Sequence, residues 1–307
     1  MAFVDVETAK IAYRIFGEGK IGLVIETALN SCSAEWWHIA EKLSTKTAVL
    51  VYDRAGYGTS DVSSLKRTPR NLAEELHKLL SKLDTTEKLI LIGHSQGGLY
   101  VQQFARLYPE RVKGLILIDP LSANDSRFKH LLTSDEYKKS GVDKLQTLKI
   151  ASALTRVGLG FLFKPLLKKS PPFYYYKNFS QDASNYILSS LTKNKQYQTA
   201  IAEYTLSHVE EEIKTLKTMD GFPEVPLTLI THHSKTAVDE IMYFGQTTLE
   251  VAEKVETIWQ NLMKECLAFS PKSRFIQAQK SSHYIHLTET EILESALEEF
   301  LLAGGQL

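Results

Sequence analysis

Apolar segments recur along the chain and alternate with segments of helical periodicity. Four of the apolar segments contain no polar alternation, as is typical of strands buried on both faces of a sheet. These runs are residues 21–25, 47–52, 88–92 and 112–118. Further strands are expected at residues 11–17, 227–231 and 274–278. Apolar residues at helical spacing predict helices over residues 34–43, 69–83, 99–108, 249–269 and 291–302. This alternation predicts an α/β fold, in which helices cover both faces of a parallel sheet.

The regular alternation stops after Asp119-Pro120 and resumes near residue 222. We therefore expect a core formed by residues 1–120 and 222–307, with a helical cap at 121–221 inserted between its two halves. Two apolar segments of this cap have alternative interpretations. The run Phe173 to Tyr176 is interpreted as cap core rather than as a platform for stacking bases. Leu159 to Phe163 is interpreted as core or pocket wall in preference to a lid that touches lipid.

The composition excludes several classes of protein. The chain has 307 residues, of which 43% are hydrophobic and 23% are charged, and its formal net charge is zero. A generally basic surface for nucleic acid is therefore not supported. The first residues have neither a basic nor a long apolar segment, and no run reaches the length of a membrane span. We expect a cytoplasmic protein without stable membrane insertion.

One strand runs directly into a motif that bears a nucleophile in many enzymes. Gly93-His94-Ser95-Gln96-Gly97 follows the run 88–92 and precedes a helical segment. A strand that turns at once into a helix holds the corner residue in a strained conformation and exposes its side chain. Glycine is needed at 93 and 97 because a Cβ there would crowd the turn. We predict that Ser95 is a nucleophile, the alternative being a serine that only caps the helix.

A serine hydroxyl needs a base within hydrogen-bond reach, and the base needs an orienting group, usually a carboxylate. His283 follows the last predicted strand and precedes the last helix, which places it on the same sheet edge as Ser95. His286 is the alternative base, three residues further on. We favour His283 because it comes first after the strand.

These motifs together resemble the α/β-hydrolase superfamily over about residues 10–303. The segments that carry the resemblance are Asp53 to Ser60, Gly93 to Gly98, Tyr108 to Val112, Leu115 to Pro120 and Ser282 to Tyr284. The resemblance implies an eight-stranded, mostly parallel sheet with a cap after the sixth strand. It also implies a small-molecule substrate and no cofactor.

The resemblance further implies an oxyanion hole made of two backbone N–H groups. Gln96, which follows the nucleophile, supplies one of them, and Leu29 in the loop after the third strand supplies the other. Ala28 stands where many members have glycine, so the backbone there must avoid positive φ. Asp53 and Arg54 are expected to hold their loop through an ion pair and N–H bonds.

The acid departs from the usual pattern of the family. Most members carry it just after the seventh strand, but this chain has no carboxylate between Thr231 and Asp239. Some members carry the acid after the sixth strand, where Asp119 stands. We predict Asp119 as the acid, with Asp239 as the alternative. The alternative interpretation is that Asp119 only turns the chain into the cap.

The sequence therefore predicts a serine hydrolase that cleaves a small, mainly hydrophobic ester, or an amide or C–C bond, through an acyl-enzyme. The histidines at 232, 233, 283 and 286 do not have convincing spacing for a metal site. Two other functions stay open. One is a ligand-binding or signalling protein on the same fold, with slow or no turnover, and the other is an acyltransferase. The oligomeric state is open as well, a homodimer included.

Overall fold

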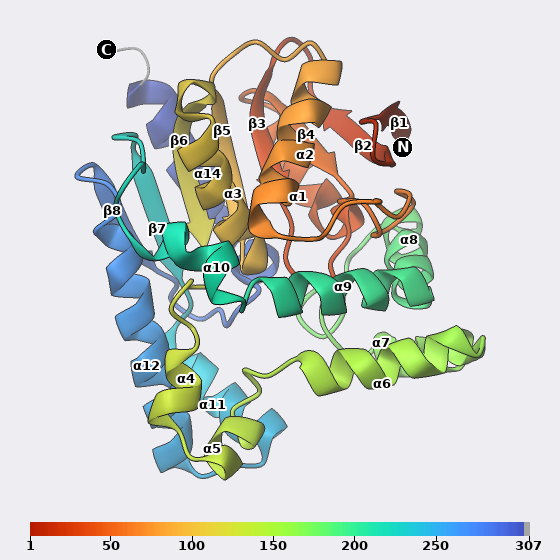
Figure 1. The fold of residues 1–307 in the computed structure, drawn as a ribbon, viewed down its shortest axis with the longest axis vertical. Coiled ribbons are helices and arrows are strands. Elements are labelled where there is room, and N and C mark those ends of the chain that lie inside the picture. The colour runs from red at the N-terminus through yellow and green to blue at the C-terminus, as the bar shows by residue number, and fades with distance from the viewer. Residues whose placement is uncertain (304–307) are drawn as a thin grey trace.

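The computed structural model describes residues 1–303, which form one eight-stranded sheet with helices around it (Figure 1). The strand order is β1-β2-β4-β3-β5-β6-β7-β8. The strand bounds are β1 Ala2–Asp5, β2 Lys10–Phe16, β3 Ile21–Glu26, β4 Ala48–Tyr52, β5 Leu89–His94, β6 Val112–Ile118, β7 Leu227–Thr231 and β8 Ser273–Gln277. The predicted fold class is confirmed.

The six strands from β3 to β8 are parallel; β2 pairs with β4 antiparallel, and the edge strand β1 pairs with β2 antiparallel. Every residue of β4, β5 and β7 is buried, in agreement with their uninterrupted apolar runs. The pattern gave no separate sign of β1, because it is a short edge strand with no buried residue. Parallel strands bring their carboxyl ends to one edge, where the loops after β3, β5, β6, β7 and β8 meet.

Two layers of helices enclose the sheet. Apolar side chains of α2, α3 and α12 pack in the core on one face, and those of α1 and α14 pack on the other. The bounds are α1 Trp37–Leu43, α2 Pro69–Lys82, α3 Gln96–Leu107, α11 Ser234–Gly245, α12 Leu249–Leu267, α13 Ile285–Thr288 and α14 Thr290–Ala303. Helix α11 was not predicted, since residues 232–245 have no clear apolar periodicity.

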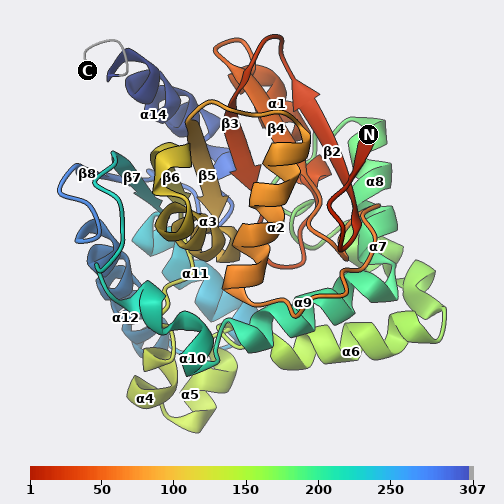
Figure 2. The same ribbon diagram turned by 45° about the horizontal axis from the view of Figure 1, so that its top comes forward.

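Between β6 and β7 the chain forms a helical insertion without a strand of the sheet. Its helices are α4 Arg127–Leu131, α5 Ser134–Lys139, α6 Leu145–Arg156, η3 Leu159–Phe163, α7 Lys164–Leu167, α8 Gln181–Leu191, α9 Asn194–Leu206, α10 Glu210–Ile213 and η4 Lys214–Lys217. Helix α9 lies between the sheet and α6 (Figure 2). No helix among residues 1–303 is long and apolar enough to cross a membrane.

Candidate active site

The turn between β5 and α3 holds Ser95 in a strained backbone conformation, with φ of 54° and ψ of −123°. The backbone of β3 passes close to this turn. A Cβ on Gly97 would lie 2.4 Å from the carbonyl oxygen of Glu26, and one on Gly93 would lie 2.6 Å from Cγ2 of Val101. These approaches explain both glycines, as expected from the sequence. The geometry presents the Ser95 side chain to the cavity described below.

His283 and Asp119 meet at the same edge of the sheet. The Nδ1 atom of His283 lies 2.6 Å from Oδ2 of Asp119, although 164 residues separate them in the chain. Asp119 is fully buried directly after β6, whereas about a third of the His283 side chain is exposed. The hydroxyl of Ser95 makes no hydrogen bond within residues 1–303. Contacts between nucleophile and base are often long without substrate.

The two alternative residues lie in different surroundings. His286 is fully buried, and its ring stacks on Trp36 with 4.0 Å between the ring centroids. Burial lowers the pKa of His286 well below the usual value, and neither ring nitrogen has a hydrogen-bond partner in the described part of the chain. Asp239 lies on α11 and pairs with Lys235 in an exposed ion pair of 2.8 Å. Neither residue contacts Ser95 or His283 through a hydrogen bond.

The backbone N–H groups expected to form the oxyanion hole belong to Leu29, in the loop after β3, and to Gln96, and both residues line one cavity. Within residues 1–303 neither N–H donates a hydrogen bond, so both are available to a ligand oxygen. Ala28 has no positive φ, as its side chain requires. The guanidinium of Arg54 fixes this loop from behind by donating to the carbonyl oxygens of Thr27 at 2.7 Å and Ala28 at 2.9 Å.

A cavity of about 720 Å³ joins these groups, since Ser95, His283, Leu29 and Gln96 all line it. Helices of the insertion and α11 to α12 form its other walls. Apolar and aromatic side chains dominate those walls; they include Leu121, Phe128, Leu148, Tyr175, Phe244 and Trp259. The run Phe173 to Tyr176 is divided: Phe173 is buried as predicted, but Tyr174 is exposed and Tyr175 reaches the cavity.

Comparisons with known proteins identify the family. A family model described as alpha/beta hydrolase fold matches residues 23–290. The chain belongs to this family. It is 22% identical to an AB hydrolase superfamily protein of Gibberella zeae, over 88% of this chain and 83% of that protein. It is 23% identical to the bovine (Lyso)-N-acylphosphatidylethanolamine lipase, over 86% and 74%. The structure of a thermophilic esterase from Thermogutta terrifontis superposes with a TM-score of 0.65 at 19% identity, covering 99% of each chain.

In this hydrolase, Asp119 has a second histidine partner that sequence reasoning missed. His232 follows β7, and its Nδ1 lies 2.8 Å from Oδ2 of Asp119, while its Nε2 lies 2.7 Å from Oε2 of Glu256. The indole Nε1 of Trp259 donates to the other oxygen of Asp119 at 3.1 Å. The one feature of the sequence that points to His232 is its position directly after β7, near the place where most family members carry the acid. Glu256 and Trp259 lie on α12, and nothing in the sequence indicated that they contact His232 and Asp119.

Charge pairing overrides burial at both ends of this contact. Burial by itself would raise the pKa of Asp119, but the charge of His232 and hydrogen bonds from His232 and His283 hold it well below its usual range. Burial would lower the pKa of His232, but Asp119 and Glu256 raise it to about 10. His232 is therefore protonated between two carboxylates, and Asp119 stays ionised for His283.

This pairing predicts a pH-dependent stability. The raised pKa stabilises the folded state fully below the unfolded value of about 6.5, and the gain is lost as the pH rises through 10. The difference in unfolding free energy between wild type and His232→Gln should therefore shrink by up to about 1.4 kcal/mol per pH unit over this interval. Urea titrations at successive pH values measure it. If the difference in unfolding free energy did not change with pH, His232 would not be protonated between the two carboxylates. Glu256→Gln should lower the folded-state pKa of His232, so that the difference disappears at a lower pH.

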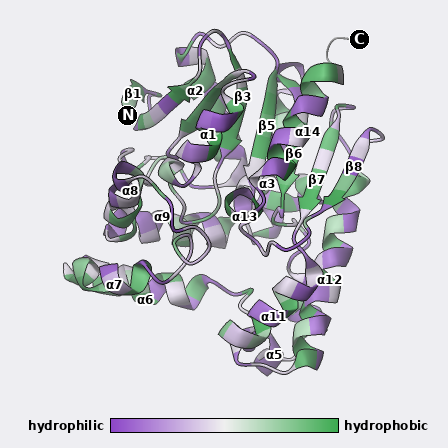
Figure 3. Ribbon diagram, turned by 180° about the vertical axis from the view of Figure 1, so that it is seen from behind, coloured by the Kyte–Doolittle hydropathy of each residue, from purple (hydrophilic) through white to green (hydrophobic). Residues whose placement is uncertain are grey.

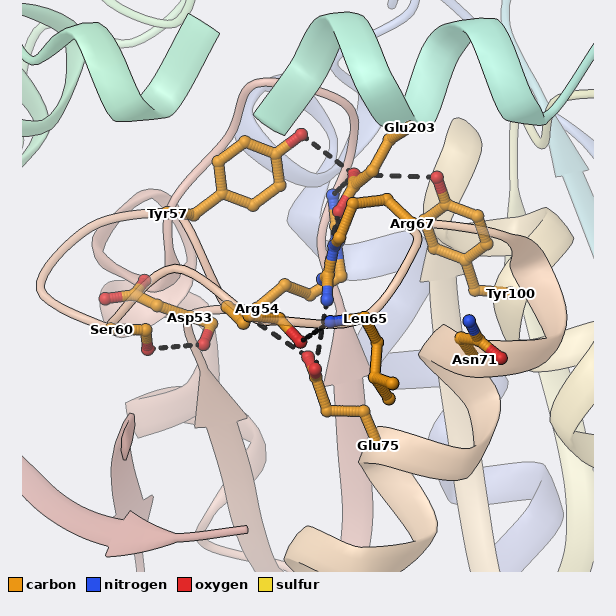
Figure 4. A network of polar contacts seen from close by, with 12 residues as sticks. Asp53, Arg54, Tyr57, Ser60, Leu65, Arg67, Asn71, Glu75, Tyr100 and Glu203 are labelled. Carbon is orange, nitrogen blue, oxygen red and sulfur yellow. Dashed lines mark hydrogen bonds and ion pairs between the residues drawn. The ribbon is translucent and has the colours of Figure 1, made fainter. Parts of the chain in front are cut away.

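Arg54 belongs to a buried network that connects the insertion to the core (Figure 4). Its Nη2 lies 3.0 Å from Oε2 of Glu203 on α9, and its Nη1 lies 2.5 Å from Oε1 of Glu26 at the end of β3. Arg67 binds Glu203 at 3.2 Å and Glu75 of α2 at 3.0 Å. Arg54 was expected to hold its own loop, but its ion pairs are with Glu26 and Glu203, and its guanidinium holds the loop after β3. Glu203 was missed, because nothing in a helical segment 149 residues away indicates this contact.

Two carboxylates beside this network, Asp53 and Glu26, have buried partners of their own. Asp53 accepts the N–H of Ser33 at 2.7 Å and of Thr59 at 3.3 Å, as expected. Glu26 at the end of β3 binds the side chains of Arg54 and Tyr52. Residues 1–303 contain no group of three or more His, Cys, Asp or Glu placed to hold a metal ion.

Proposed function

We propose that this hydrolase cleaves carboxylic esters of small, mainly apolar substrates through Ser95, His283 and Asp119. The observation that carries the proposal is the 2.6 Å contact between His283 Nδ1 and Asp119 Oδ2 beside a cavity that also contains Ser95. The apolar walls of that cavity favour an apolar substrate. The names of the esterase and the lipase among the similar proteins agree with ester chemistry.

The reaction follows from the placement of the groups. His283 takes the proton of the Ser95 hydroxyl through Nε2, and the oxygen of Ser95 attacks the ester carbonyl carbon. The N–H groups of Leu29 and Gln96 stabilise the oxyanion, a contribution of roughly 3 kcal/mol for each donor. His283 then protonates the departing alcohol. Water attacks the acyl-enzyme, gives its proton to His283 and releases the acid.

Asp119 holds the Nδ1–H of His283, so that Nε2 faces Ser95 and the imidazolium formed in the reaction is stabilised. His232 and Glu256 act on Asp119 and not on the substrate, and are therefore positioning residues. A ligand-binding protein without turnover was favoured by the missing carboxylate after β7. Asp119, directly after β6, supplies a carboxylate to His283, so the missing carboxylate after β7 no longer favours a protein without turnover.

A panel of p-nitrophenyl esters of increasing acyl length tests this proposal, together with fluorophosphonate labelling. We expect turnover and a covalent adduct on Ser95, and loss of both in Ser95→Ala. His283→Ala should also lose turnover, because the hydroxyl then lacks its base. Labelling without turnover would indicate a binding protein, and ester exchange with added alcohol in preference to hydrolysis would indicate an acyltransferase. Absence of labelling at Ser95 would overturn the assignment of the nucleophile.

A further inference from the structure

The outer part of the helical insertion carries an unusual distribution of charge. Residues 144–181, which include α6, η3 and α7, contain seven lysines and arginines and no aspartate or glutamate. The remainder of the chain has 29 basic and 36 acidic residues, so the neutral total conceals one strongly basic segment. We call residues 149–177 the basic arm. Six of the seven cations lie in it: Lys149, Arg156, Lys164, Lys168, Lys169 and Lys177.

The cations of the basic arm are exposed, and none of the six forms a salt bridge within residues 1–303. Elsewhere on the surface several lysines have partners, such as Lys78 with Glu7 and Lys254 with Glu136. Unpaired cations without nearby carboxylates create a positive field that attracts an anionic surface. The arm therefore differs from the mixed charge of the rest of the molecule.

The same arm exposes large apolar side chains. Those more than half exposed are Ile150, Val157, Phe161, Leu162 and Leu166, with exposed fractions between 56% and 67%. The expectation that the run Leu159 to Phe163 forms core or pocket wall is therefore wrong for Phe161 and Leu162. Apolar groups concentrated in one short segment and interleaved with cations are typical of a surface that binds a partner.

The arm is placed so that it can meet a flat partner. Helix α6 lies on the outside of α9, farther from the sheet (Figures 1 and 2), and α7 follows η3 and contacts η3 and α8. Figure 3 shows hydrophobic and hydrophilic residues side by side along α6 and α7. The other side of α6 contributes Thr147 and Leu148 to the wall of the cavity.

We propose that the basic arm binds the surface of a lipid bilayer that carries negative charge. Lysine and arginine are attracted to anionic headgroups, and phenylalanine and leucine insert at the boundary between headgroups and acyl chains. A nucleic acid would use the cations but would leave Phe161, Leu162 and Leu166 in water. A second copy of this chain would bring two basic arms together, which their charge opposes. An anionic lipid surface satisfies both the cations and the apolar side chains.

Flotation with vesicles tests the proposal on the full chain and does not depend on the ester chemistry. The protein should float with vesicles of phosphatidylcholine and phosphatidylglycerol, and much less with phosphatidylcholine alone. Added salt should weaken the binding, because it screens exposed charges. Lys168→Glu/Lys169→Glu should reduce the binding constant at least about tenfold. Phe161→Ser/Leu162→Ser should reduce it by a similar factor through the loss of inserted apolar surface.

Matched controls lie at the other side of the molecule. Lys264→Glu/Lys272→Glu changes the charge equally at exposed positions of α12 and the loop before β8, and should bind vesicles like wild type. Phe275→Ser removes an exposed phenylalanine of β8, 42% exposed, and should also have no effect. Urea midpoints establish that each variant is folded.

Four results would overturn the proposal. These are no binding to anionic vesicles, equal binding to neutral ones, equal losses in the control variants, and binding of a DNA duplex as tight as that of vesicles. Sedimentation velocity tests whether a second copy of this chain binds the basic arm. A dimer in wild type that dissociates in Phe161→Ser/Leu162→Ser would identify the arm as an interface between copies of this chain instead.

Discussion

Asp119→Asn should lower kcat for ester hydrolysis by about four orders of magnitude, the effect of losing the carboxylate that orients a catalytic histidine. The side chain lies 2.6 Å from Nδ1 of His283 and is fully buried. An amide at this position carries no charge and can turn its NH2 group toward His283. His283 is then no longer held in the tautomer that accepts the proton of Ser95. Steady-state kinetics with a p-nitrophenyl ester measures the loss.

Asp239→Asn is the matched control, because it makes the same chemical change at the alternative acid, the first carboxylate after β7. Asp239 is exposed and paired only with Lys235, so kcat should stay near the wild-type value. The urea midpoint of Asp119→Asn shows whether the variant is still folded. If Asp239→Asn alone lost activity, the assignment of the acid to Asp119 would be wrong.

Glu203→Gln should destabilise the protein by about 3–5 kcal/mol, which is typical when one partner of a buried ion pair is removed. Glu203 is fully buried and accepts from Arg54, Arg67 and the hydroxyl of Tyr57. A glutamine is nearly the same size, but its NH2 group faces two buried guanidinium groups that lose the carboxylate they share and keep only Glu26 and Glu75. This loss is a large share of the 5–15 kcal/mol that usually stabilises a folded protein. The free energy of unfolding in urea measures it.

Glu74→Gln provides the comparison on the surface. Glu74 pairs with Arg70 at 3.0 Å on α2, where both side chains are well exposed, so its loss should cost less than about 1 kcal/mol. Similar small losses in both variants would show that the buried network adds little net stability. Glu203→Gln should also reduce kcat where it remains folded, since Glu203 holds the Arg54 that fixes the Leu29 loop.

The predictable parts of this protein are those that short-range pattern determines. Seven of the eight strands were predicted, and four of them were identified by uninterrupted apolar runs, because a strand buried on both faces needs apolar side chains at every position. The turn at Ser95 was predictable because the neighbouring atoms lie so close to residues 93 and 97 that only glycine fits there. Strand β1 and helix α11 were not readable, since an exposed edge strand and a short partly buried helix have weak patterns.

Tertiary structure decided which distant side chains share an environment. It placed Asp119 against His283 and His232, Glu203 against Arg54, and Phe161 in solvent instead of in a core. Sequence spacing carries no information about such contacts, because they depend on how the insertion and α12 pack against the sheet. The sequence by itself determined the sheet, its helices and the strained turn at Ser95. The partners of the buried charges and the exposed face of the insertion were set only by folding, which brings together residues that lie more than a hundred positions apart.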